Sequence, residues 1–186
     1  MTNRNVFISD IPHSDKPQVK TLCFLTRLNE LGEQEYLLGI HHKQQKWNGF
    51  GGKVGDEKEF ENETVEESLM REAKEELNIV LTNFTKKGIG EFTFHKQDVI
   101  EKVELHIFFA DQWEGEIQSD GELNNLTWFT KENMPWKQMW NSDRPWLEKI
   151  IYSKEGEFFS IKVDFPELDE NIPAEIEISS NYESKV

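Results

Sequence analysis

The segment of residues 63–79, Glu-Thr-Val-Glu-Glu-Ser-Leu-Met-Arg-Glu-Ala-Lys-Glu-Glu-Leu-Asn-Ile, restricts the possible folds of this chain more than any other stretch. Thr64 followed three residues later by Glu67 is a capping box, which marks the first turn of a helix. The apolar residues of the segment form one stripe at helical spacing, namely Leu69, Met70, Ala73 and Leu77. The sequence therefore predicts an amphipathic helix over 64–77 that packs one face against the rest of the protein.

The same helix carries a cluster of acidic residues. Because a helix turns by about 100° per residue, Glu72, Glu75 and Glu76 fall within an arc of about 100°. Carboxylate clusters of this kind suit a hard divalent cation such as Mg²⁺ or Mn²⁺, although solvated acidic helix faces are common as well. Arg71 precedes Glu75 by four residues and is predicted to orient that carboxylate from the flank.

The passage before the helix favours the metal interpretation. It reads Trp-Asn-Gly-Phe-Gly-Gly-Lys-Val over residues 47–54. Glycine lets the backbone come close to a ligand and exposes its amides and carbonyls. A glycine-rich loop, one lysine (Lys53) and a helix of carboxylates together indicate a site for a metal-bridged polyphosphate.

Length and charge limit the partners of the chain. Its 186 residues suit one domain, and 21 Lys and Arg against 36 Asp and Glu give a net charge of −15. This charge disfavours stable binding to nucleic acid or to an anionic membrane, and an anionic substrate then requires local cations. The single cysteine, Cys23, cannot form an internal disulfide. No apolar run is long enough to span a membrane, so we expect a cytoplasmic protein. The sequence leaves open whether it is a monomer or a homodimer.

Hydrophobic patterning predicts an α/β fold with a mixed β-sheet and a helix on each face. Strands are expected at 19–26, 35–41, 79–81, 90–94, 103–110, 126–130 and 158–165, and a second helix between about 135 and 152. Residues 1–18 are expected to form a flexible N-terminal extension, 19–166 the domain, and 167–186 an acidic C-terminal tail. Within that tail, 174–178 can add an edge strand.

The segment ending at Ile79 resembles the signature of the Nudix hydrolases. That signature is Gly, five residues, Glu, seven residues, Arg-Glu, an apolar residue, any residue, Glu-Glu, any residue, Gly, apolar. The matching residues are Glu63, Arg71, Glu72, Ala73, Glu75, Glu76 and Ile79. Ten residues instead of five separate Gly52 from Glu63, and Asn78 replaces the last glycine. Asparagine is the next most tolerant residue of a left-handed helix terminus.

This resemblance implies a Nudix α/β/α sandwich that hydrolyses a nucleoside diphosphate derivative with Mg²⁺, or with Mn²⁺ in its place. It implies four catalytic residues, Arg71, Glu72, Glu75 and Glu76. The implied metal ligands are the Gly51 carbonyl and the three glutamates, and the resemblance leaves open which glutamate is the base. If Gln118 holds the position of a further carboxylate ligand, that ligand is either missing or replaced by Asp120 or Glu122.

Two motifs are similar to those of the oxidised purine nucleoside triphosphatases, the animal and MutT-like 8-oxo-dGTP diphosphatases. They are residues 47–54 and the run Pro-Trp-Lys-Gln-Met-Trp-Asn-Ser-Asp-Arg-Pro-Trp over 135–146. The similarity implies that Asn48 hydrogen-bonds a purine, that Trp140 stacks on it, and that Ser142 and Asp143 stand where the relatives carry two aspartates. The other residues expected to bind substrate are Thr21, Phe50, Gly51, Gly52 and Lys53. Because serine is shorter and less charged than aspartate, the preference for an oxidised base stays open.

The resulting expectation is Mg²⁺-dependent conversion of an oxidised purine nucleoside triphosphate, such as 8-oxo-dGTP, to the monophosphate and pyrophosphate. One alternative keeps the chemistry and changes the substrate to a nucleotide sugar, a dinucleoside polyphosphate or capped RNA, the last disfavoured by the acidic surface. Another alternative is a nucleotide-sensing Nudix domain without turnover. The intact set of Glu72, Glu75 and Glu76 argues against a sensor.

Overall fold

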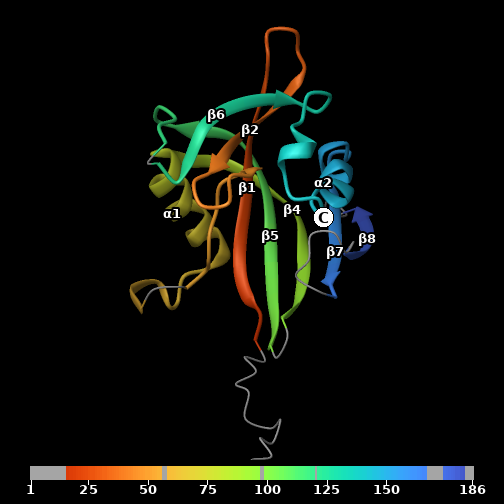
Figure 1. Ribbon diagram of the computed structural model, residues 1–186. Coiled ribbons are helices and arrows are strands. Elements are labelled where there is room, and N and C mark those ends of the chain that lie inside the picture. Colours follow the sequence, from red (N-terminus) through yellow and green to blue (C-terminus); the bar gives the residue numbers. More distant parts are fainter. Residues whose placement is uncertain (1–15, 56–57, 97–98, 120, 167–173, 183–186) are drawn as a thin grey trace, which may run out of the picture.

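The computed structural model describes residues 16–55, 58–96, 99–119, 121–166 and 174–182 (Figure 1). The expected N-terminal extension lies outside these ranges except for residues 16–18, of which Gln18 already belongs to the first strand. The limits of the domain at residues 19 and 166 remain predictions from the sequence. None of the helices in the described ranges is long and apolar enough to cross a membrane.

Within these ranges, two α-helices and eight strands make up the fold (Figure 1). The strands are β1 (Gln18–Leu28), β2 (Gln34–His41), β3 (Trp47–Asn48), β4 (Val80–Lys96), β5 (Val99–Glu114), β6 (Leu123–Thr130), β7 (Glu157–Phe165) and β8 (Glu175–Tyr182). The helices are α1 (Val65–Leu77) and α2 (Arg144–Ile151), with short 3-10 turns at Lys58–Phe60 and Trp136–Gln138.

The strands form one mixed sheet in the order β3-β2-β1-β5-β4-β7-β8, and β6 pairs with β2. The β1–β5 and β4–β7 pairs are parallel, and the other pairs are antiparallel. Figure 1 shows α1 and α2 on opposite sides of the central strands. This arrangement confirms the predicted α/β sandwich with a helix on each face.

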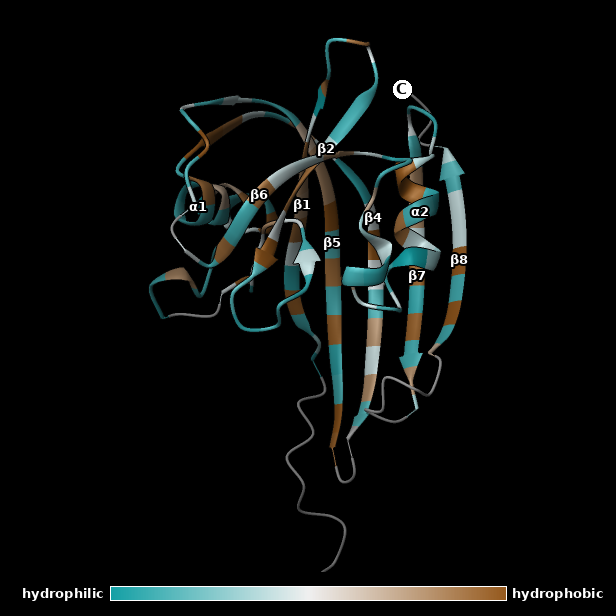
Figure 2. Cartoon of the chain, turned by 45° about the horizontal axis from the view of Figure 1, so that its top comes forward, coloured by the Kyte–Doolittle hydropathy of each residue, from teal (hydrophilic) through white to brown (hydrophobic). Residues whose placement is uncertain are grey.

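Alternation along β1 explains the two layers, because successive side chains of a strand point to opposite faces. Leu22 and Phe24 belong to the hydrophobic cluster under α2, whereas Cys23 and Leu25 belong to the cluster under α1. Figure 2 shows brown and teal bands along β5 and β7, where apolar and polar residues follow one another.

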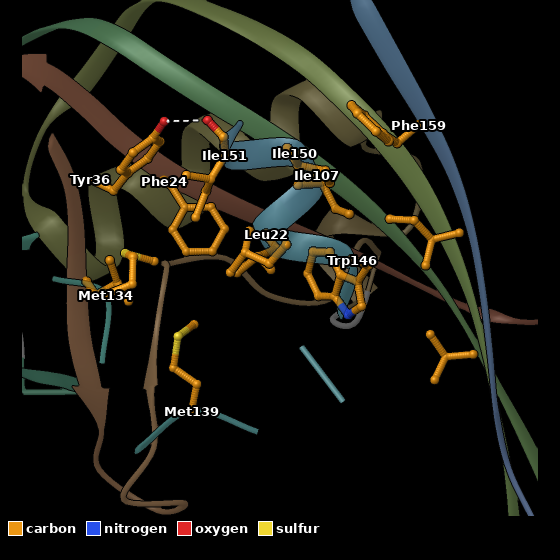
Figure 3. Packing of buried hydrophobic residues seen from close by; sticks show 14 of the residues in the cluster. Leu22, Phe24, Tyr36, Ile107, Met134, Met139, Trp146, Ile150, Ile151 and Phe159 are labelled. Carbon is orange, nitrogen blue, oxygen red and sulfur yellow. Dashed lines mark hydrogen bonds between the residues drawn. The ribbon is translucent and has the colours of Figure 1, made fainter. Parts of the chain in front are cut away.

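The cluster under α2 also ties the helix to the β2 strand. The Tyr36 hydroxyl donates to the Ile151 carbonyl at 3.1 Å, at the C-terminal end of α2 (Figure 3). Trp146 is buried in the same cluster and meets the Phe92 ring edge-on, with 6.1 Å between ring centroids. These contacts fix the helix that follows the predicted purine-binding motif.

Three sequence expectations change in the structure. The strands expected at 79–81 and 90–94 are one continuous strand, β4, whose register against β5 shifts between Leu81 and Phe84 and again at Lys86–Gly88. These irregularities break the period of two that reveals a strand in a sequence. The edge strand offered by the sequence at 174–178 is present but longer, because β8 pairs with β7 from Glu175 to Tyr182. The predicted apolar stripe of α1 includes Met70, which is 40% exposed, and the inward position is taken by Glu76.

Candidate active site

The glycine-rich loop of residues 49–54 is fastened to β1 by backbone hydrogen bonds. Phe50 and Cys23 exchange two of them, at 2.7 and 3.0 Å. The Thr21 N–H donates to the Gly52 carbonyl at 2.8 Å, and the Gly52 N–H donates to the Thr21 hydroxyl at 3.2 Å. The loop is therefore held like an extra strand, with a fixed path in front of α1.

Two of the glycines are required by close approaches. Gly51 has a φ of +137°, and a Cβ atom there would lie 2.4 Å from the Thr21 carbonyl oxygen. A Cβ atom on Gly52 would lie 2.2 Å from Oε1 of Glu72. The absence of side chains at these positions brings the loop backbone directly against the carboxylates of α1.

The helix α1 begins and ends as its sequence predicts. Thr64 and Glu67 form both hydrogen bonds of the capping box, and Asn78 adopts the left-handed conformation at the C-terminus with a φ of 56°. Between these two ends, Glu76 points inward and Glu75 outward. Glu76 is 2% exposed, whereas the Glu75 side chain is 51% exposed.

Glu76 is an unusual buried acid. Its Oε1 accepts the Gly51 N–H at 3.2 Å, whereas its Oε2 is buried without a hydrogen-bond partner. Burial raises the pKa of Glu76 to about 9; the Gly51 N–H opposes this, and the nearby Glu72 and Glu122 charges add to it. An orphaned carboxylate oxygen of this kind lacks a positive partner.

Arg71 organises the other acids of the site. Its guanidinium donates to both oxygens of Glu63, at 3.1 and 2.9 Å. One further nitrogen donates to Glu72 at 2.8 Å and to Glu75 at 2.9 Å. The predicted contact of Arg71 with Glu75 is thus present, and Glu63 emerges as its main partner. The Glu63 carboxylate also accepts the Gly55 N–H at 2.9 Å, which ties the inserted loop to the helix.

The donor set fits a divalent cation. Carboxylate and backbone carbonyl oxygens are the ligands that Mg²⁺ and Mn²⁺ prefer, and a cation would satisfy the buried Oε2 of Glu76. In the part of the chain that the structure describes, no three His, Cys, Asp or Glu side chains converge as a ready metal cluster. Arg71 engages Glu72 and Glu75, so a metal ion has to compete with the guanidinium for these two carboxylates.

The second motif lies beside the start of the glycine-rich loop. The indole N–H of Trp47 donates to the Gln138 side chain at 2.7 Å, which joins the two motifs directly. Asn48 uses its Oδ1 to accept the Gly49 N–H at 2.9 Å, so its amide nitrogen is the group that it can offer to a ligand. Trp140 is half-buried, and the Lys46 ammonium lies 5.3 Å from the centroid of its ring.

Asp143 is the buried acid of this second motif. It is 7% exposed and stands directly before α2, but its side chain makes no capping hydrogen bond. Burial raises the pKa of Asp143 to about 7, and the Lys46 charge partly opposes this. Ser142 is half-buried beside it. Near neutral pH, Asp143 therefore exists in both protonated and ionised forms.

Some of the remaining residues expected to bind substrate lie with their backbone against the carboxylates, and others have their side chains engaged within the protein. The backbone of Gly51 and Gly52 lies against the Glu76 and Glu72 carboxyl groups. Phe50 is 2% exposed with its side chain in the cluster under α1, so only its backbone is available to a ligand. The Thr21 hydroxyl is buried against Gly52, and the Lys53 carbonyl accepts from Arg71 at 3.1 Å. Sequence reasoning missed Lys46 and Gln138, because their roles depend on contacts between distant segments.

The raised pKa of Asp143 makes the free energy of unfolding depend on pH between about pH 4 and 7. Because its folded pKa exceeds the usual 3.8, the folded state binds more protons than the unfolded state between about pH 4 and 7. The contribution of Asp143 to stability is therefore fully present at low pH and is lost as pH rises to about 7. We expect Asp143→Asn to be near neutral at pH 4 and to stabilise the protein at pH 8, by at most about 4 kcal/mol.

Urea unfolding of Asp143→Asn and wild type from pH 4 to 9 measures this difference directly. Asp111→Asn is the control, because Asp111 is exposed and bonds only a surface asparagine. A difference between Asp143→Asn and wild type that stays constant across the pH range would contradict the burial of an acidic proton at this position.

Comparison with known proteins places this geometry in a family. The NUDIX domain matches residues 17–150, which is most of the chain. The chain therefore belongs to the Nudix hydrolases.

Individual proteins that resemble the chain show which members of this family it is similar to. The oxidized purine nucleoside triphosphate hydrolase of Danio rerio is 36% identical over 109 residues, which span 59% of this chain and 65% of that protein, slightly under two thirds. The enzyme of the same name from Mus musculus is 31% identical over 127 residues, spanning 67% of this chain and 76% of that protein. The MutT protein structure from Bacillus halodurans superposes with a TM-score of 0.67 over 88% of this chain and 97% of its own, at 22% identity. That last similarity concerns the fold alone.

Proposed function

We propose that this Nudix hydrolase converts purine nucleoside triphosphates, including oxidised ones such as 8-oxo-dGTP, to the monophosphate and pyrophosphate. The observation that carries the proposal is the continuity of residues 46–52, which run from the contacts of Lys46 with Trp140 and of Trp47 with Gln138 to the Glu72 and Glu76 carboxylates. One nucleotide can then place its base at one end of the loop and its phosphates at the other. The names of the animal relatives support the same substrate class.

At the phosphate end, we assign Glu72, Glu75, Glu76 and the Gly51 carbonyl to the binding of Mg²⁺, with Mn²⁺ as a substitute. A bound cation would neutralise phosphate charge and lower the pKa of bound water. Arg71 positions Glu72 and Glu75 through its two hydrogen bonds. One of the three glutamates accepts the proton of the attacking water.

A fourth carboxylate is proposed at Glu122. Its charge reaches Glu76 closely enough to raise the pKa of that residue. Gln118 is exposed and donates its backbone N–H to the Leu77 carbonyl at 3.0 Å. Asp120, the other candidate, lies outside the described residues. Glu122 is therefore the candidate that the electrostatics of the site support.

At the base end, Trp140 offers a stacking surface and Asn48 an amide donor. Asp143 can accept a hydrogen bond in either protonation state and can also donate one when protonated. This versatility suits a purine edge that presents both an N–H and a carbonyl. We propose that the enzyme thereby removes damaged purine nucleotides in the cytoplasm, where a buried free thiol such as Cys23 is ordinary.

The test is pyrophosphate release with Mg²⁺ from ordinary and oxidised purine and pyrimidine triphosphates, with ADP-ribose and a dinucleoside polyphosphate included. We expect hydrolysis of purine triphosphates with oxidised purines preferred, and loss of activity when EDTA replaces Mg²⁺. Turnover confined to ADP-ribose or the dinucleoside polyphosphate would refute the substrate assignment. Nucleotide binding without any turnover would instead indicate a sensor.

A further inference from the structure

A lysine that matches no family motif lies at the base end of the site. The Lys46 ammonium is 5.3 Å from the centroid of the Trp140 ring, within the range of a cation–π interaction. Its backbone is held in place, because the Lys46 carbonyl accepts the His41 N–H at 2.9 Å. The next residue, Trp47, is bonded to Gln138 and packs edge-on against Phe129, with 5.0 Å between ring centroids. Lys46 therefore faces the 136–143 segment through fixed neighbours.

The charge of the same lysine also acts on the buried acid Asp143. The Asp143 N–H donates to the Trp140 carbonyl at 3.0 Å, so both residues belong to one turn. Lys46 is also the cation whose charge favours the ionised form of Asp143. An ammonium donor over the Trp140 ring and a carboxyl acceptor in the same turn as Trp140 thus lie at the aromatic side chain on which a base would stack.

A hydrogen-bond donor beside an acceptor is complementary to one particular arrangement of polar groups on a base. An ammonium group can only donate hydrogen bonds, whereas an ionised carboxylate can only accept them. Together they are complementary to a ring carbonyl next to a ring N–H, which is the lactam edge. Hypoxanthine, guanine and 8-oxoguanine carry this edge. Adenine presents the reverse order, an amino donor next to a ring nitrogen acceptor.

We infer that Lys46 is a specificity-determining residue, which donates to the carbonyl of a lactam-bearing purine while Asp143 accepts from the adjacent N–H. This inference rests on the proposed function and narrows its substrate class to lactam-bearing purines. Ser142 stands beside Asp143 as an uncharged neighbour. The proposed recognition site therefore has one acidic side chain, Asp143, and one basic side chain, Lys46. The charge of Lys46 then replaces part of the recognition that two acids would provide.

The test compares inosine and adenosine triphosphates, which differ only at positions 1 and 6 of the purine. We expect the wild type to prefer ITP over ATP. Lys46→Met keeps the aliphatic stem and removes the charge, and we expect it to lower kcat/KM for ITP about 10-fold while changing that for ATP less than about twofold. The ITP loss should appear mainly in KM. Lys43→Met is the control, because Lys43 is an exposed lysine of the same loop.

An equal loss for both nucleotides, or an unchanged ratio of ITP to ATP, would overturn the role of Lys46. Equilibrium binding of IMP and AMP to the same variants gives a readout that needs no hydrolysis. If the wild type hydrolyses no triphosphate, the proposed function fails, but a preference for IMP that disappears in Lys46→Met still supports the inference. Equal binding of IMP and AMP by the wild type would overturn it.

Discussion

Replacing Glu76 by glutamine is expected to lower kcat by at least about 1,000-fold, equivalent to about 4 kcal/mol, without destabilising the metal-free protein. The loss of activity is not accompanied by a loss of stability because of the way in which Glu76 is buried. Its Oε1 accepts the Gly51 N–H, and a glutamine amide oxygen preserves that bond. With a pKa of about 9, the carboxyl group is already uncharged at neutral pH when no cation is bound. Glutamine then removes no charge from the folded state but can no longer supply a carboxylate to a metal ion.

Thermal unfolding in EDTA and in increasing Mg²⁺ distinguishes this prediction from simple misfolding. The wild type should melt at a higher temperature as Mg²⁺ rises, because an ion that binds only the folded state stabilises it. Glu76→Gln should melt at least as high as the wild type in EDTA and should gain much less from Mg²⁺. Glu66→Gln, an exposed change in the first turn of α1, is the matched control. Near-normal turnover in Glu76→Gln would refute the metal assignment.

The local parts of the site are predicted well by the sequence, because their causes are local. The start of α1 is set by a capping box that runs from Thr64 to Glu67, and its end by Asn78, the residue after the helix. The strands β1 and β2 likewise lie over the two apolar runs that predict them, 19–26 and 35–41. Signals of this range are readable from neighbouring residues. The order of residues in α1 is therefore enough to place its carboxylates on one helix.

The rest depends on contacts between distant segments. Whether Glu76 or Met70 faces inward is decided by the glycine-rich loop, which satisfies Glu76 through the Gly51 N–H. The two motifs of the proposed base-binding end lie together because Trp47 bonds Gln138, a residue 91 positions later. The continuity of β4 is hidden by irregularities that are stabilised only by pairing with β5. Periodicity carries no information on such pairings, which is why Lys46 cannot be identified from the sequence.

The second large effect is expected at Arg71. Its guanidinium side chain is only 17% exposed and bonds Glu63, Glu72 and Glu75 at 2.8–2.9 Å. The Glu63 side chain is 8% exposed, so removal of the arginine leaves a buried carboxylate without its cation. Breaking a buried pair by removing one partner costs about 3–5 kcal/mol. We expect Arg71→Met to lower the melting temperature by about 10 °C and to reduce activity as well, because Glu72 and Glu75 lose their positioning.

The pH dependence of this loss identifies its cause. The hydrogen bonds from Arg71 hold the pKa of Glu63 below its usual value of 4.5. The stabilisation from this pair is therefore present above that usual pKa and is lost as pH falls through the lower folded value. The stability difference between wild type and Arg71→Met should shrink correspondingly below about pH 4.

A double-mutant cycle with Glu63→Gln completes the test, because an uncharged glutamine no longer needs the guanidinium. Arg71→Met should cost clearly less in the Glu63→Gln background than in the wild type. Arg144→Met is the control for loss of an exposed ion pair, since Arg144 meets Glu148 at 3.5 Å with 56% of its side chain exposed. Equal costs for Arg71→Met in both backgrounds would contradict a buried Arg71–Glu63 pair. The stability of the carboxylate helix would then have to come from its apolar contacts, because no other cation bonds Glu63 among the ion pairs of the described residues.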